Sequence, residues 1–491
     1  MYILTQIVSF VSRTVFIKLL GDQYLGISGL YSNILSLLSL ADLGIATAFM
    51  FALYKPLADK DYDKLAALLG FFKKLFILIA AVVLGVGMAF VPFLKYVIKD
   101  SAIEYGKLQL YFILSAINSA CTYIAAYKSV VFRADQKVYV VNVVSAITNL
   151  LLHILQITLL YITKNYLFYL IATIAVTFIY NFTLTFLANR RYPEIFKRKP
   201  TPLSSEDKKL IFGNMKSLIV YRISAAIMNS TSNILISVIL GTVIVGYYSN
   251  YAMIVSIVTA VVSIVSGSLL GSIGNLGATK DEGRRGELFH TIMLMYYGIA
   301  TFCAVCFISI FNDFILFWLN DETYLLSQRD VYLIVFTFFI NCISTPIWMF
   351  RESFGLFHKA KYVMTIAAVI NIGFGILGGI LLGVGGVIAA TGLAHLVTLF
   401  WYEPRYLYKD AFKLPYKNYW LHVAYYMIQV AIVVLASIFI TRFIDSTLLG
   451  MILKVLVCFA VSAIVFILFN AKTKEGKILV SKIKILVKRG K

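Results

Sequence analysis

The sequence predicts an all-α, polytopic membrane protein of about fourteen transmembrane helices, arranged as two pseudo-symmetric six-helix lobes plus two C-terminal helices. Three observations predict this class. The chain of 491 residues is 60% hydrophobic and only 14% charged, whereas soluble domains are about 45–50% apolar and about 25% charged. Its apolar residues form blocks of roughly 20 residues, the length that crosses a bilayer core of ~30 Å. Parts of the sequence are also repeated.

The expected spans follow from the hydropathy of these blocks. They lie near 1–17, 29–54, 75–94, 108–127, 138–162, 167–189, 212–240, 248–275, 288–311, 331–350, 362–382, 387–401, 418–441 and 448–470. Each is long enough, and poor enough in charge, to form a transmembrane helix.

Basic residues are divided unevenly between the two sides of these spans. Alternate connections hold 33 of the 44 Lys and Arg, and the connections on the opposite side hold only seven. The basic connections are 55–74, 128–137, 190–209, 276–287, 351–361, 402–417 and 471–491. Because cytoplasmic loops carry the excess of Lys and Arg, both termini are predicted to be cytoplasmic. The net charge of +21 therefore reflects topology, and we expect no nucleic-acid partner.

An internal repeat predicts the two lobes. The segment GLYSN at 29–33 recurs as GYYSN at 246–250, and Phe-Arg at 132–133 recurs at 350–351. The offsets are 217 and 218 residues, so a duplicated unit of six spans is expected. An even number of spans returns the chain to the same side, which predicts two lobes related by an axis along the membrane normal.

The repeat sets the expected domain boundaries. We expect an N-lobe with spans one to six over residues 1–205 and a C-lobe with spans seven to twelve over 206–410. Residues 411–491 would hold spans thirteen and fourteen and a basic cytoplasmic tail. The linker at 190–209 is basic and contains three prolines.

Polar residues follow helical spacing in five spans. The sets are Gln6, Ser9 and Arg13; Ser115, Asn118, Thr122 and Ser129; Asn142, Ser145, Asn149, His153 and Gln156; Arg222, Asn229 and Asn233; and Thr337, Asn341, Thr345, Trp348 and Glu352. At 100° per residue, each set falls on one helix face. In a single helix such residues also bridge packed helices, at about 0.6 kcal/mol per bond. Five sets in one chain favour a hydrated interior cavity.

Ionisable residues within spans mark the expected ligand path. Arg13 and Arg222 are candidate cavity cations, although Arg13 would also suit snorkelling to the outer interface. Asp42 is the candidate coupling-ion site, or else the partner of an arginine. His153 is either a titrating cavity group or a hydrogen-bonded packing residue.

Together these residues predict a site for an anionic ligand rich in hydroxyl groups. Arg binds phosphate by paired hydrogen bonds, while Tyr and Asn offer stacking and hydrogen bonding to sugars. The expected substrate-binding residues are Arg13, Arg222, His153, Asn149, Asn229, Asn233, Tyr31, Asn33, Tyr248 and Asn250. Tyr31 and Asn33, with Tyr248 and Asn250, would line the outer mouth or serve packing. No Walker motif, metal-ligand cluster or nucleophile–base set stands out, so neither cofactor nor enzymatic activity is expected.

The sequence also resembles a known family. The matching text is SRTVFIKLLGDQYLGISGLYSN from residue 12, LSLADLGIATAFMFALYKPLA from residue 38, and VFRADQKVYVVN from residue 131. It is similar to the polysaccharide transporter (Wzx-type flippase) family, within the multidrug/oligosaccharidyl-lipid/polysaccharide (MOP) exporter superfamily. In that resemblance, Arg13 matches the basic position of the first span and Asp42 the DLG segment; Arg222 has only a general parallel.

The resemblance implies a flippase that moves undecaprenyl-diphosphate-linked oligosaccharide repeat units across the bacterial cell membrane by alternating access. The product would serve capsule, exopolysaccharide or cell-wall polysaccharide synthesis, with polysaccharide polymerase and glycosyltransferases as partners. Three alternatives remain: a lipid-linked peptidoglycan-precursor flippase, a MATE-like drug exporter, and a membrane polysaccharide polymerase or glycosyltransferase. Buried arginine would repel cationic drugs, and the longest outer connection, 312–330, is short for a catalytic domain.

Overall fold

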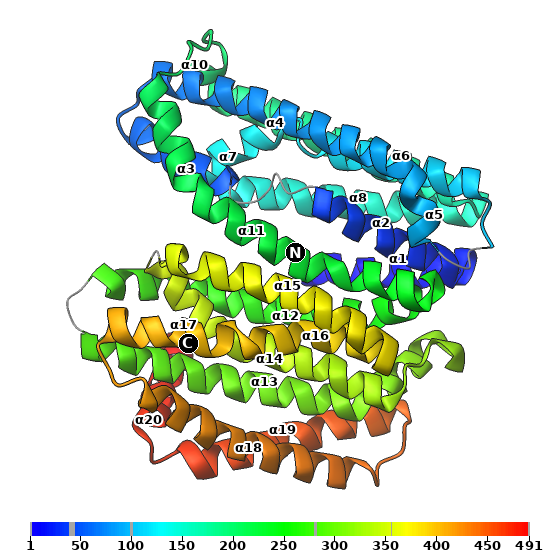
Figure 1. Cartoon of the computed structure of the whole chain (residues 1–491), viewed down its shortest axis with the longest axis vertical. Helices are drawn as coiled ribbons and strands as arrows, with labels where there is room; N and C mark the ends of the chain where they lie inside the picture. The colour runs from blue at the N-terminus through cyan, green and yellow to red at the C-terminus, as the bar shows by residue number, and fades with distance from the viewer. Residues whose placement is uncertain (1, 39–44, 99–101, 279–281, 355, 490–491) are drawn as a thin grey trace. The chain divides into compact units, whose positions relative to one another are not determined.

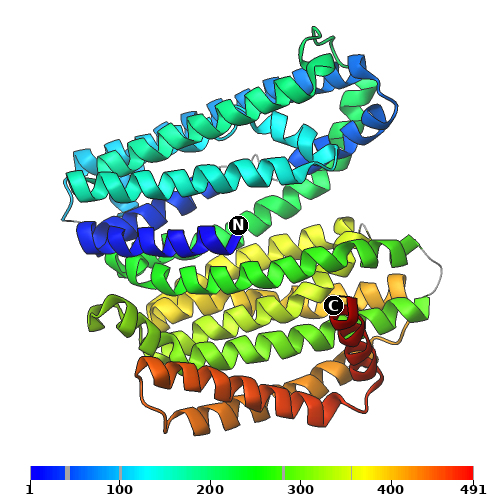
Figure 2. The ribbon, with the colours of Figure 1, turned by 180° about the vertical axis from the view of Figure 1, so that it is seen from behind.

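The computed structural model describes residues 2–38, 45–98, 102–278, 282–354 and 356–489, and every regular element in these residues is a helix. The chain divides into two compact units, Met1–Gly246 and Tyr247–Lys491. Figure 1 and Figure 2 show both units as bundles of long helices from opposite sides. The fold class predicted from the sequence is confirmed.

The first unit is built from eleven α-helices and one short 3-10 turn among the described residues. They are α1 (Tyr2–Leu20), α2 (Asp22–Leu38), α3 (Ile45–Ala58), α4 (Tyr62–Phe90), η2 (Val91–Phe93), α5 (Leu94–Val97), α6 (Tyr105–Cys121), α7 (Ala126–Ala134), α8 (Val138–Thr163), α9 (Tyr166–Arg191), α10 (Pro193–Phe196) and α11 (Ser205–Leu240). The next helix, α12 (Thr242–Ala278), begins in this unit and continues into the second.

The second unit continues from α12 to the tail. Its further elements are α13 (Glu282–Leu319), η3 (Glu322–Tyr324), α14 (Gln328–Ser353), α15 (Phe357–Leu382), α16 (Val384–Val397), α17 (Leu399–Tyr406), the π-helical turn η4 (Leu407–Phe412), α18 (Lys417–Thr441), α19 (Leu448–Asn470) and α20 (Lys474–Arg489). In Figure 2 the short α20, in dark red, is steeply inclined to the long helices of this unit.

Twelve helical segments of the described residues are long and apolar enough to cross a membrane. They correspond to the expected spans three to fourteen, from Tyr62–Val97 to Leu448–Asn470. The expected first span coincides with α1. The expected second span, 29–54, falls on α2 and α3 and on residues 39–44, which lie outside the described part. The chain is a polytopic membrane protein.

The lobes predicted at 1–205, 206–410 and 411–491 stay a prediction. The compact units divide the chain elsewhere, because α11 packs against α2 and α3 and so joins the first unit.

The repeat is visible in the backbone at two helix breaks. Gly21 separates α1 from α2 with φ +86°, and Gly241 separates α11 from α12 with φ +102°. A side chain is strained in this left-handed region, whereas glycine adopts it readily. The Leu-Gly pairs at 20–21 and 240–241 thus end equivalent helices in the same way.

A reciprocal close approach fixes the register of the repeat. A Cβ atom at Gly26 would lie 2.0 Å from the carbonyl oxygen of Thr242, and one at Gly246 would lie 2.7 Å from that of Asp22. Asp22 and Gly26 stand 220 residues before Thr242 and Gly246. The structural partner of Gly246 is therefore Gly26, and the pairing of GLYSN with GYYSN by text is wrong by three residues.

The corrected register pairs Tyr31 with Tyr251 instead of Tyr248. Both side chains are buried, with 1% and 0% exposure. The hydroxyl of Tyr31 donates to the carbonyl of Leu108 at 2.7 Å. The hydroxyl of Tyr251 accepts from the amide of Leu326 at 3.0 Å and donates to Asn312 at 2.7 Å. Each tyrosine therefore links the second helix of its half to the chain at or just before the fourth.

Replacing Gly26 with leucine should destabilise the protein, because the side chain would meet the backbone of Thr242. Overpacking costs about 1–3 kcal/mol or more, which we expect to appear as a lower thermal unfolding temperature in detergent. Gly85 in α4 is the matched control, since a Cβ atom there meets nothing within 4 Å. Gly85→Leu should leave stability equal or raised by about 1 kcal/mol. Equal effects of the two substitutions would contradict the close approach.

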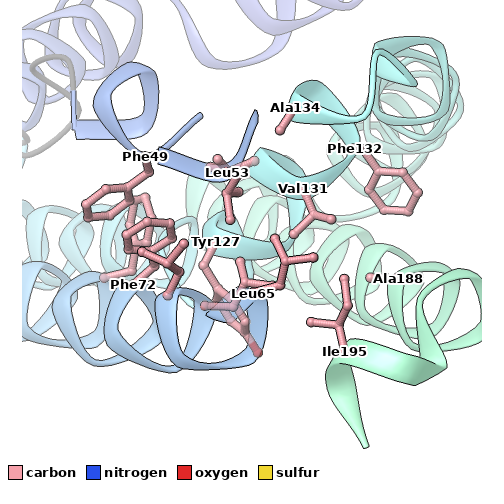
Figure 3. Close-up of a cluster of buried hydrophobic side chains, with 14 of the residues drawn as sticks. Phe49, Leu53, Leu65, Phe72, Tyr127, Val131, Phe132, Ala134, Ala188 and Ile195 are labelled. Carbon is pink, nitrogen blue, oxygen red and sulfur yellow. The ribbon is translucent and has the colours of Figure 1, made fainter. Parts of the chain in front are cut away.

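A hydrophobic cluster holds the end of the first unit where α3, α4, α7, α9 and α10 meet (Figure 3). Phe49 of α3 stacks on Phe72 of α4 with ring centroids 3.5 Å apart. Val131 and Phe132 of α7 are fully buried in the same cluster. It fixes the short α7 within the bundle.

Candidate functional site

Helix α8 carries the polar face that the sequence predicted. Asn142 and Asn149 are exposed, Ser145 and His153 are half-buried, and Gln156 is buried. Asn149 donates to Ser145 at 3.4 Å. The Nδ1 atom of His153 is buried and has no hydrogen-bond partner among the described residues. This face offers amide, hydroxyl and imidazole groups along more than three helical turns.

A second exposed face of α8 is apolar. Val143, Ile147 and Ile154 are 46%, 54% and 58% exposed. At 100° per residue they lie about 120° around the helix from Asn142 and Asn149. An apolar exposed face suits lipid, while exposed amides at membrane depth are costly unless they meet water or a polar ligand. The two faces of α8 therefore border two different environments.

Arg13 lies on α1, which packs against α8. Its side chain is half-buried and lies near enough to Tyr169 of α9 for electrostatic interaction. Phe16, one turn further along α1, meets Tyr169 edge-on with ring centroids 5.0 Å apart. The structure thus places one arginine among the helices α1, α8 and α9 of the first unit.

The polar stripe predicted on the fourth span serves mostly in helix packing. Asn118 of α6 accepts from Thr177 of α9 at 2.8 Å, and Asn181 of α9 donates to the carbonyl of Cys121 at 2.7 Å. Ser115 donates to a carbonyl of its own helix. For this stripe the packing role applies. One further bond, from Gln156 of α8 to Thr173 of α9 at 3.1 Å, continues the seam.

The predicted residues of α11 are distributed over several environments. Asn229 is exposed. Asn233 is half-buried, with its Nδ2 atom 3.8 Å from a Cβ atom built at Gly29 of α2, and its Oδ1 has no hydrogen-bond partner among the described residues. The side chain of Arg222 and the whole of Asp42 lie outside the described residues.

The residues of the two repeated segments are more buried than a lining of the outer mouth requires. Tyr31 is bound to Leu108 as described, and Asn33 donates to the carbonyl of Gly29 at 2.8 Å. Tyr248 is half-buried and Asn250 is fully buried. Of the four, Tyr31 and Asn33 bind the protein itself through the groups that would contact a ligand.

The polar stripe on the tenth span also faces other helices. Thr337 of α14 donates to the carbonyl of Ile388 at 2.9 Å, and Asn341 bonds to His395 of α16 at 2.8 Å. At the end of α14, Arg351 is paired with Glu403 of α17 at 2.5 Å, and both side chains are fully buried. Its sequence twin Arg133 is exposed, so the two halves differ here.

Two sets of residues were missed from the sequence. On α12, Ser256, Thr259 and Ser263 are exposed at spacings of three and four, the same signal that found the α8 face. The second set is His290, His422 and Glu475, which come together from α13, α18 and α20. No spacing rule could reveal this cluster, because each residue comes from a different helix.

Comparison with solved structures identifies the fold. The lipid II flippase MurJ, in an inward-closed conformation, matches with a TM-score of 0.71 at 15% identity, covering 96% of this chain and 98% of that one. An inward-facing MATE multidrug-resistance transporter of the MOP superfamily matches with 0.67 at 13% identity, covering 82% and 94%. The MATE multidrug transporter DinF-BH matches with 0.61 at 14% identity, covering 84% and 93%.

These likenesses define the class first: the chain is a multi-pass, all-helical membrane protein with the fold of the MOP superfamily. Within that class it is similar to MurJ over almost its whole length, and to the MATE transporters over a smaller share. No protein-family model and no curated protein matches the chain.

Proposed function

We propose that the protein is a flippase for undecaprenyl-diphosphate-linked oligosaccharide repeat units, working by alternating access in the bacterial cell membrane with both termini cytoplasmic. The observation that carries the proposal is the pair of exposed faces on α8. One face is apolar, and the other presents Asn142 and Asn149 beside Ser145 and His153. A transporter needs a wall that meets lipid on one side and a hydrophilic ligand on the other.

The chemistry of the polar face suits the two parts of such a ligand. Amides and hydroxyls both donate and accept, as sugar hydroxyls require. Arg13 lies on the neighbouring helix and is the proposed partner of the diphosphate, since guanidinium binds phosphate oxygens in pairs. Arg222, Asn229, Asn233, Tyr248 and Asn250 remain proposed contacts, with Asp42 as the proposed coupling-ion site. The product would pass to a polymerase, with glycosyltransferases supplying the substrate.

A second candidate is a lipid-linked peptidoglycan-precursor flippase. It is favoured by the match to a lipid II flippase over 96% of the chain, against 82–84% for the two MATE transporters. Both candidates share a polyprenyl diphosphate and differ in the attached sugars and peptide. A drug exporter is less favoured, because the half-buried Arg13 would repel cationic drugs.

Reconstitution tests the proposal. We expect proteoliposomes holding the purified protein to move a fluorescent polyprenyl-diphosphate oligosaccharide between leaflets faster than empty liposomes do. The competing readouts are a lipid-linked peptidoglycan precursor and a cationic dye. Movement of the precursor alone would select the second candidate, and movement of the dye alone would overturn both flippase functions.

The α8 face gives a matched pair of variants. Asn142→Ala with Asn149→Ala should slow flipping by about tenfold or more, since each lost hydrogen bond to the ligand is worth about 0.5–1.5 kcal/mol. Val143→Ala with Ile154→Ala removes two exposed side chains from the apolar face of the same helix. That control should keep near-normal flipping in the same proteoliposome assay. If the control lost as much activity, the polar face would have no special role.

A further inference from the structure

The second unit holds a cluster of metal-binding side chains apart from the proposed transport path. One ligand atom each from His290, His422 and Glu475 lies within 4.8 Å of the other two. His290 is on α13, His422 on α18 and Glu475 in the first turn of α20. All three stand beside the connections 276–287, 402–417 and 471–491, which the excess of basic residues places on the cytoplasmic side.

The hydrogen bonds of His422 leave one ring nitrogen directed at the carboxylate. Its Nδ1–H donates to the carbonyl of Asn418 at 2.7 Å. In the neutral ring, Nε2 then carries a lone pair, and this atom lies 3.7 Å from Oε1 of Glu475. A lone pair facing a carboxylate oxygen is stabilised by a cation between them. A hydrogen bond spans about 2.7–3.2 Å, so the gap suits a bound metal ion better than a shared proton.

The second histidine is oriented in a similar way. One nitrogen of His290, Nε2, is bonded to the hydroxyl of Tyr408 at 2.5 Å. The ring of His290 stacks on that of His422 with centroids 4.0 Å apart. Histidines that bind metals usually have one ring nitrogen held by a carbonyl, carboxylate or other acceptor, which orients the ring. Both histidines have such partners already.

The geometry requires only small movements to accept an ion. Zinc binds His nitrogen and carboxylate oxygen at about 2.0–2.2 Å, so two ligands of a tetrahedral ion lie about 3.3 Å apart. A cavity of about 250 Å³ adjoins the cluster and is lined in part by His422, Thr473 and Glu475. It leaves room for a water molecule as fourth ligand.

We propose that His290, His422 and Glu475 form a binding site for a divalent transition-metal ion of the zinc class. Two imidazoles and one carboxylate match the preferences of Zn²⁺ and Co²⁺, whereas Mg²⁺ and Ca²⁺ prefer oxygen ligands alone. The ion ties the start of α20 to α13 and α18. The neighbouring pair of Lys474 with Glu287 of α13, at 2.5 Å, holds α20 on the same surface.

Metal titration of the full chain tests the site. The protein, purified without a polyhistidine tag and treated with EDTA, is titrated with ZnCl₂, CoCl₂ and MgCl₂ by calorimetry. We expect one Zn²⁺ per chain, a Co²⁺ complex with the absorption of tetrahedral cobalt, and no saturable Mg²⁺ binding. His422→Ala and Glu475→Gln should each weaken zinc binding at least tenfold. Both side chains are partly exposed, 27% and 20%, so the variants should fold, which size-exclusion chromatography checks.

Glu287→Gln is the matched control. It removes a carboxylate from the same region and breaks the pair with Lys474 without touching the cluster. Its zinc affinity should equal that of the unaltered protein. Absence of saturable zinc binding, or equal affinity in Glu475→Gln and Glu287→Gln, would overturn the site.

The tie to α20 has its own measurement. Zinc should slow tryptic cleavage at Lys474 and Lys477 in the unaltered protein and leave cleavage of Glu475→Gln unchanged. Zinc that binds without protecting these bonds would overturn the tethering role.

Discussion

Arg13→Ala should abolish flipping of the lipid-linked oligosaccharide while the folded protein remains in the membrane. Truncating one partner of a buried charged contact costs about 2–5 kcal/mol, which corresponds to about 30-fold or more in rate at about 1.4 kcal/mol per tenfold change. Arg13→Lys should recover part of the activity, since it keeps the charge and loses the planar fork. The measurement is leaflet exchange in proteoliposomes, and Arg222→Ala is expected to behave in the same way.

Arg133→Ala is the matched control for charge, because Arg133 belongs to the same unit and is exposed at the end of α7. It should flip substrate at the normal rate. Full activity of Arg13→Ala would remove Arg13 from the proposed site. Equal losses in both variants would point to a general effect of positive charge.

Glu403→Gln should be among the most destabilising single substitutions in the second unit. The Arg351 guanidinium is fully buried against Glu403, and removing one partner leaves a buried charge at a cost of about 3–5 kcal/mol. Thermal unfolding in detergent measures the effect. Arg351→Met combined with Glu403→Leu should recover much of the loss, because an apolar pair avoids the desolvation of both charges.

An exposed ion pair provides the comparison. Lys474 and Glu287 are 67% and 44% exposed, and exposed pairs are worth about 0–1 kcal/mol. Glu287→Gln should therefore shift the unfolding temperature little. A similar shift in both variants would show that burial of Arg351 and Glu403 adds nothing to their coupling.

Much of the fold was predictable because it depends on composition and period. Twelve expected spans appear as helices of the predicted type, since long apolar blocks in a membrane have few alternatives to a helix. The polar face of α8 followed from spacing alone. The register of the repeat did not, because three residues move a side chain by almost one helical turn, and only the contact of Gly26 with Thr242 reveals the correct pairing.

The site was less predictable, since the same side chains serve ligands and packing. Asn118 and Asn341 stood in polar stripes like Asn149, yet the structure bonds them to Thr177 and His395. Nothing within one helix distinguishes the two roles, because the difference lies in which neighbour faces the stripe. The cluster at His290 has the same origin, since its members meet only when separate helices pack.

The two exposed faces of α8 have a consequence for how this helix tolerates change during evolution. Any large apolar residue serves at Ile147 or Ile154, because hydrocarbon chains make no directional demands. At Asn142 and Asn149 the requirement is a hydrogen-bonding group of limited size. A saturation library screened for export should therefore show two kinds of permissive position alternating along one helix: one selected for oiliness, and the other for donors and acceptors.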